Sequence, residues 1–129
     1  MNPLVALVVF GVACLLLVTT ILVGRMRARH KIMAPATAGH PMFERAYRVQ
    51  MNTIEQAVIF LPAFLLAAHF GRSDVACVLG AIWLFARLGY LITYMRNPGS
   101  RAASFVLGML AVLVLLGQAG WGIVQQLMA

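Results

Sequence analysis

Charged residues are scarce in this chain, and acidic residues are the scarcest. Of 129 residues, 10% are charged, with three Asp and Glu against ten Lys and Arg. Hydrophobic residues make up 63%, which is more apolar surface than one soluble domain of this length could bury. The composition therefore argues against an ordinary soluble fold, and the length allows a single domain covering residues 1–129.

Cysteine and histidine are also too few, and too scattered, for a metal centre. Cys14 and Cys77 each lie within an apolar stretch, and the three histidines are far apart in the sequence. Because structural metal motifs need closely spaced ligands, we predict no metal and interpret both cysteines as packing residues. The net charge of +7 does not indicate nucleic-acid binding, since no soluble module is left to carry it.

The apolar residues occur in long blocks, and the blocks predict membrane-spanning helices. Residues 3–24 contain no charge, and as a helix they would reach about 33 Å, enough to cross a bilayer core of ~30 Å. Similar blocks cover residues 75–95 and 102–129. A fourth span is apolar only over residues 56–70, so its helix must begin earlier and include the charged segment 43–55. The predicted fold is an all-α integral membrane bundle of four transmembrane helices.

The basic residues gather at the ends of these spans. We expect the first helix to end near Arg25, with a polar linker to Pro41, and the third to end at the turn 97–99. Most of the bases lie in this linker or on either side of this turn: Arg25, Arg27, Arg29, Lys31, Arg96 and Arg101. The positive-inside rule then predicts that these two connections are cytoplasmic and that both termini lie on the other side. Positive charge follows the first apolar block instead of preceding it, which argues against a cleaved signal peptide.

Two polar stripes run along the predicted second and third helices. At 100° per residue, Arg48, Asn52 and Glu55 fall on one face of the second helix, within about 60°. Gln50 lies on nearly the opposite side, about 200° from Arg48. If Gln50 and Arg48 contact the same ligand, they must come from different copies of the helix, which predicts an oligomer.

The third helix presents Arg87, Tyr90 and Tyr94 at helical spacing, and Arg101 follows the turn. Arginines, one carboxylate, amides and phenols together suit a small zwitterion with excess negative charge. Glutathione fits, because its two carboxylates match the arginines and its ammonium matches Glu55. The alternative is that Glu55 forms a structural ion pair with Arg48 or Arg87 and that the tyrosines belong to an interfacial belt.

Two motifs resemble the MAPEG superfamily, the membrane-associated proteins of eicosanoid and glutathione metabolism. One is GHPMFERAYRVQMNTIE, residues 39–55, and the other is LFARLGY, residues 84–90, with Tyr94 and Arg101 after it. The resemblance extends over essentially the whole chain as a single transmembrane domain, and it implies a homotrimer. Gln56 is a departure, because leukotriene C4 synthase, a member of this superfamily, has a tyrosine there and that contact is lost or altered.

The resemblance also implies roles for individual residues. Arg101 is similar to the catalytic arginine that activates the thiol of glutathione. Two residues, Arg27 and Gln50, resemble contacts from the neighbouring subunit. Five further residues resemble the contacts that one subunit makes with glutathione: Arg48, Asn52, Glu55, Tyr90 and Tyr94.

The expected function is transfer of glutathione to a lipophilic electrophile, or glutathione-dependent reduction of a lipid hydroperoxide, as part of detoxification. The expected location is a bacterial inner membrane, which the chain crosses several times. Two alternatives remain open from the sequence. A non-catalytic member of the superfamily would bind lipids as a scaffold, although Arg101 with Tyr90 and Tyr94 counts against it. A small four-helix multidrug transporter would also carry an intramembrane glutamate, but without neighbouring arginines such as Arg48.

Overall fold

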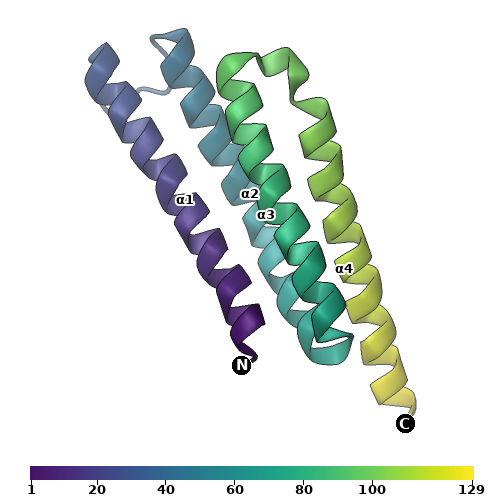
Figure 1. The fold of residues 1–129 in the computed structure, drawn as a ribbon. Coiled ribbons are helices and arrows are strands. Elements are labelled where there is room, and N and C mark those ends of the chain that lie inside the picture. Colours follow the sequence, from purple (N-terminus) through teal and green to yellow (C-terminus); the bar gives the residue numbers. More distant parts are fainter.

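The structure, a computed structural model, describes all residues 1–129 and consists almost entirely of helix. Four long helices run alternately up and down, so both termini lie at the same end of the bundle (Figure 1). A short 3-10 helix, η1 (Pro98–Ser100), forms the turn before the last long helix. All four helices are long and apolar enough to cross a membrane, which confirms the predicted fold class. The long helices are α1 (Pro3–His30), α2 (Pro41–Phe70), α3 (Ser73–Arg96) and α4 (Ala102–Met128).

The prediction that the first helix ends near Arg25 is wrong, because α1 continues to His30. The bases that follow the apolar block occupy its last turns, where positive charge interacts favourably with the helix dipole. Lys31 then ends the helix in a left-handed conformation, with φ of 55°. The early start of α2 is confirmed: Pro41 is its first residue, and His40 Nδ1 accepts a hydrogen bond from the Met42 amide at 3.1 Å.

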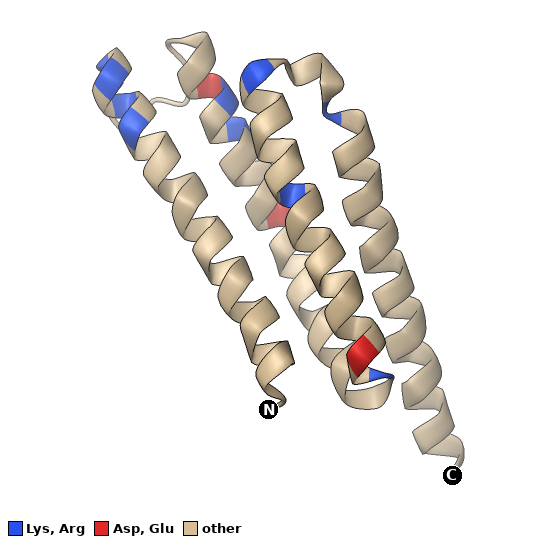
Figure 2. Cartoon of the chain, in the orientation of Figure 1, with Lys and Arg blue, Asp and Glu red and all other residues tan.

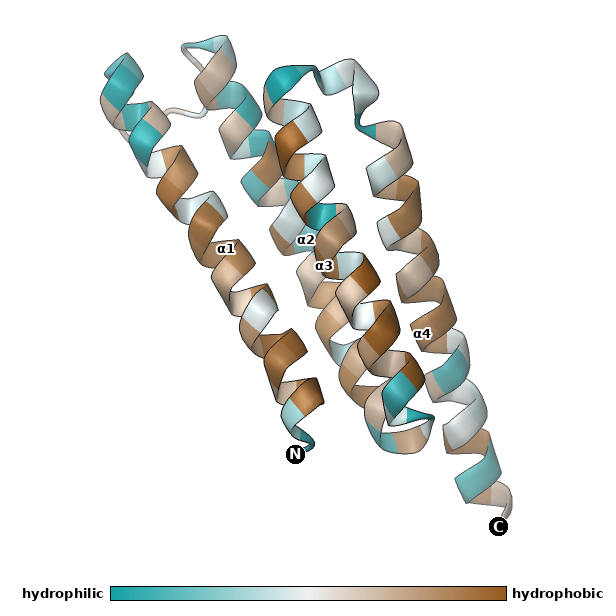
Figure 3. Ribbon diagram, viewed as in Figure 1, coloured by the Kyte–Doolittle hydropathy of each residue, from teal (hydrophilic) through white to brown (hydrophobic).

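Helices α2 and α3 form the centre of the bundle, since each packs against all three other long helices. Their contact combines large aromatic rings with small residues: Phe60 stacks on Trp83 with 4.0 Å between ring centroids, and Phe64 lies against Gly80. Many large apolar side chains on α1 and α4 are exposed instead, and apolar residues cover the middle of the helices (Figure 3). Exposed apolar faces of this kind are expected of an integral membrane protein, in which lipid or a neighbouring subunit covers them.

The two ends of the bundle differ in charge. Basic residues gather where α1 ends, where α2 begins and where α3 turns into α4 (Figure 2). We call this the cationic end, and the opposite end, which holds both chain termini and the α2–α3 turn, the terminal end. The terminal end carries one ion pair, from Arg72 Nη2 to Asp74 Oδ2 at 2.8 Å, and both side chains are exposed.

Candidate functional site

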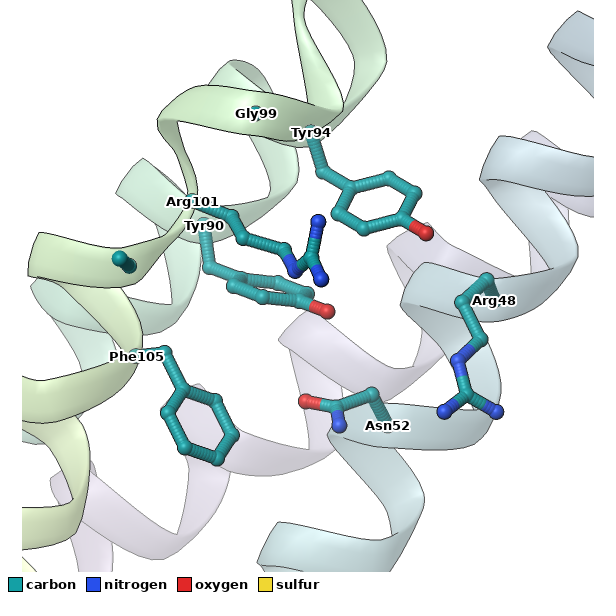
Figure 4. Close-up of a pocket in the computed structure, with 8 residues that line it drawn as sticks. Arg48, Asn52, Tyr90, Tyr94, Gly99, Arg101 and Phe105 are labelled. Carbon is teal, nitrogen blue, oxygen red and sulfur yellow. The ribbon is translucent and has the colours of Figure 1, made fainter.

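A cavity of about 460 Å³ opens at the cationic end, between α2, the last turns of α3 and the start of α4. Figure 4 shows its side chains: the tyrosines and Arg101 come from α3 and the α4 side, and Arg48 and Asn52 face them from α2. The main lining side chains are Arg48, Asn52, Tyr90, Tyr94, Arg101 and Phe105. Five of these six are residues that the sequence predicts for a ligand site, and the folded chain brings them together.

The turn between α3 and α4 holds Arg101 at the rim of the cavity. The Asn97 side chain accepts a hydrogen bond from the Gly99 amide at 3.1 Å, which stabilises η1. Arg101 then follows directly, and its Nη1 donates to the Pro98 carbonyl at 2.7 Å. Its guanidinium carbon lies 5.5 Å from the centre of the Tyr94 ring, and Figure 4 shows the side chain extending between the two tyrosines. An exposed cation beside two phenols can stabilise an anion placed at this rim.

The α2 wall continues the predicted stripe into a second cavity. Arg48 and Asn52 line the first cavity, whereas Asn52 and Glu55 line a smaller one of about 210 Å³. The two cavities share Asn52 and Phe105, so they adjoin. Glu55 is exposed and forms no ion pair within the chain, whose one ion pair is between Arg72 and Asp74. The alternative that Glu55 is paired with Arg48 or Arg87 inside the chain is therefore wrong.

The structure adds Phe105 to the site and changes the place of Arg87, which the sequence put on one stripe with Tyr90 and Tyr94. Phe105 lines both cavities, and its place one helical turn after Arg101 is the signal that could have found it. Arg87 lies behind the cavity wall, 1% exposed, with its guanidinium carbon 4.1 Å from the centre of the Tyr90 ring. Its position three residues before Tyr90 placed it on the right helix face, but its burial could not be foreseen.

Comparison with known proteins identifies the family of this chain. The sequence model of the MAPEG family matches residues 5–121, nearly the full length. The chain belongs to the MAPEG family. The resemblance seen in the two sequence motifs is thereby confirmed.

Of three relatives of this MAPEG chain, two have names that state an activity. An uncharacterized protein of Synechocystis sp. is 41% identical over 95% of this chain and 89% of its own length. Microsomal glutathione S-transferase 2 of Homo sapiens is 35% identical over 76% of this chain and 68% of its own length. Leukotriene C4 synthase of Cavia porcellus is 34% identical over 77% of this chain and 66% of its own length.

Two predicted site residues of this MAPEG protein lie away from the cavity. Gln50 donates from Nε2 to Thr20 Oγ1 on α1 at 3.2 Å. Arg27 donates from Nη1 to the Ala36 carbonyl at 2.8 Å and lies over the Phe43 ring. Neither lines either of the two cavities described. Their assignment to a ligand held by a neighbouring subunit stays a prediction.

The departure at position 56 has a structural consequence. Gln56 is 7% exposed, and its Oε1 accepts a hydrogen bond from Trp83 Nε1 at 3.3 Å. Its Nε2 in turn donates to Met109 Sδ at 3.0 Å. Both ends of this amide are thus occupied by contacts within the bundle, so Gln56 ties α2 to α3 and α4 at the floor of the smaller cavity.

Proposed function

We propose that this MAPEG protein is a membrane-bound glutathione transferase that conjugates the glutathione thiolate to lipophilic electrophiles. The observation that carries the proposal is the cavity at the cationic end. It gathers two exposed arginines, Arg48 and Arg101, with an amide and two phenols, and neither arginine is neutralised by an acidic partner. Such a cavity suits a small ligand with more than one carboxylate.

Glutathione matches this arrangement group by group. Its two carboxylates would pair with Arg48 and with donors such as the Asn52 amide. Its ammonium would lie near Glu55, which is exposed and free of an ion pair. In a homotrimer, Arg27 and Gln50 of a neighbouring subunit would complete the site. The names of two relatives, a glutathione S-transferase and leukotriene C4 synthase, support this choice of ligand.

The proposed chemistry begins with the thiol of glutathione beside Arg101. A neighbouring guanidinium stabilises the thiolate and lowers the pKa of the thiol, and the released proton passes to water. The sulfur then attacks an electrophilic carbon, a carbon–sulfur bond forms, and the leaving group departs with its electron pair. Holding both reactants in one site supplies a further part of the rate acceleration.

The electrophile would enter from the bilayer, into which it partitions. The smaller cavity supports this route, since Ile59, Met109 and Val112 line it beside Glu55. The same thiolate would reduce a lipid hydroperoxide: two glutathiones give a disulfide, and the peroxide gives an alcohol and water. These reactions would serve detoxification, in a bacterial inner membrane.

Glutathione binding to the purified full-length protein tests the proposal. We expect saturable binding with the ultraviolet absorbance of a thiolate at neutral pH, together with conjugation of chlorodinitrobenzene. Binding of lipid without thiolate absorbance or conjugation would instead indicate the non-catalytic scaffold. Proton-coupled efflux from vesicles would indicate a transporter, which membership of the MAPEG family already counts against.

A further inference from the structure

Arg87 is a buried cation with no acidic partner. It lies in the middle of α3, is 1% exposed, and no carboxylate forms an ion pair with it. Two of its nitrogens, Nε and Nη1, are buried without any hydrogen-bond partner. Burying an unpaired charge is costly, and a side chain retained only for packing would be better replaced by an apolar one. This combination points to a role for the charge.

The third nitrogen of Arg87 makes the informative contacts. Nη2 donates to Asn52 Oδ1 and to Thr53 Oγ1, each at 3.0 Å. The Thr53 hydroxyl gives its own proton to the Val49 carbonyl at 2.7 Å, so it is fixed as an acceptor toward Arg87. Since a guanidinium can only donate, the group of Asn52 that faces it must be the carbonyl oxygen.

We propose that Arg87 is a positioning residue that fixes Asn52 as a pure hydrogen-bond donor toward the ligand and adds a permanent positive charge behind the cavity wall. With Oδ1 held by Arg87, the Asn52 Nδ2 group keeps both of its hydrogens for the two adjoining cavities that this residue lines. The site then requires an acceptor oxygen at that point, and the buried charge favours a carboxylate over a neutral ester. The inference deepens the proposed function and rests on it for the identity of the ligand.

The Tyr90 ring separates this charge from the cavity. The guanidinium carbon of Arg87 lies 4.1 Å from the ring centre, and Tyr90 itself lines the cavity. Charges interact more strongly across a low-dielectric protein interior than through water. Arg87 can therefore act on a bound anion without touching it, whereas Arg48 and Arg101 are exposed to solvent and its counterions.

The test compares the binding of glutathione with that of its diester, in which both carboxylates are capped. In wild-type protein we expect a clear preference for glutathione. Arg87→Met should reduce that preference about tenfold or more, as expected for loss of a charge-assisted interaction, and Arg87→Lys should restore part of it. Thr53→Val is the matched control, because it removes the other acceptor of the same nitrogen; it should leave the preference within about twofold. Equal weakening of both ligands in Arg87→Met, or the same loss in Thr53→Val, would overturn the inference.

A second measurement needs no ligand and so separates this inference from the proposed function. Asn52→Asp places a carboxylate next to the Arg87 guanidinium, so thermal unfolding should show it tolerated when Arg87 is present. In the Arg87→Met background the same carboxylate loses its buried cation and keeps only the exposed Arg48 and Arg101 in the cavity, so Asn52→Asp should lower Tm markedly. Additive effects of the two substitutions would overturn the assigned contact. If wild-type protein binds no glutathione, the proposed function fails, and this stability cycle alone decides the role of Arg87.

Discussion

The two ends of the bundle use the same helices in opposite ways. At the terminal end, α4 packs closely on the α2–α3 connection: Gln118 Nε2 donates to the Ala67 and Arg72 carbonyls at 3.1 and 2.9 Å, and Gly122 lies against the backbone of Phe70. At the cationic end, α2, α3 and α4 surround a cavity lined by exposed arginines. One end is closely packed and the other holds an open, charged cavity, so substitutions at the two ends should affect different properties.

The largest effect on activity is expected for Arg101→Ala at the cationic end. Removing the cation beside the bound sulfur should lower the thiolate fraction at neutral pH at least about tenfold. Conjugation of chlorodinitrobenzene should slow in parallel, and raising the pH should partly restore the rate. Glutathione should remain bound, because its carboxylates and ammonium are held elsewhere. Thiolate absorbance measured against pH provides the check.

Arg96→Ala is the matched control for this experiment, since Arg96 is an exposed base at the end of α3, just before the same turn, and does not line the cavity. Its titration curve should match that of the wild type. If Arg101→Ala also gave the wild-type curve, Arg101 would be a headgroup anchor, and the lipid-binding scaffold would become the preferred function.

The largest effect on stability is expected for Gly122→Val at the terminal end. A Cβ at this position would overlap the Phe70 carbonyl oxygen, so α4 would have to move away from α2. Overpacking of this kind costs about 1–3 kcal/mol, and thermal unfolding in detergent should show a lower Tm. Gly120→Val is the control, because nothing lies within 4 Å of a Cβ at Gly120. A Tm equal to that of the control would show that the close packing at this end is unimportant.

Some parts of the structure can be predicted from the sequence, and others cannot. The four spans follow from their apolar blocks, and the early start of α2 follows from the shortness of its apolar part. The end of α1 is not at Arg25, as the charge pattern predicts, but at His30. Arginine is a good helix former, so the first charged residue after an apolar block does not mark the end of the helix. The contact between Gly122 and Phe70 joins residues far apart in the sequence, and no local pattern encodes it.

Glu55→Gln should have an intermediate effect, on binding more than on the fold. The carboxylate is exposed on one chain and makes no ion pair, so its loss removes no internal contact. Glutathione binding should weaken about tenfold, as expected when a charge-assisted contact to the ammonium is lost. Equilibrium dialysis and chemical cross-linking would measure binding and assembly separately. Glu44→Gln, another exposed carboxylate on α2, should leave both unchanged.

If Glu55→Gln binds glutathione normally while the assembled protein separates into single chains, then Glu55 is a structural residue between subunits.

The stripe from Arg48 to Glu55 is visible in the sequence as helical spacing, and the structure places it along two adjoining cavities. Spacing could not show that Arg87 would be buried and bonded to Asn52. Burial depends on how α3 rotates against α2, which is decided by packing of the whole bundle.

The smallest effect is expected at the terminal end, from Asp74→Asn, and it bears on how the two ends lie in the membrane. Bases gather at the cationic end, whereas the α2–α3 turn carries Arg72 with its partner Asp74. The positive-inside rule counts Lys and Arg and gives acidic residues little weight. A reporter fused after Ala129 should therefore be active only outside the cytoplasm, both in the wild type and in Asp74→Asn. Stability should hardly change, because exposed ion pairs contribute little. Cytoplasmic activity of the wild-type fusion would contradict the predicted orientation, and reversal in Asp74→Asn alone would show that this single carboxylate controls it.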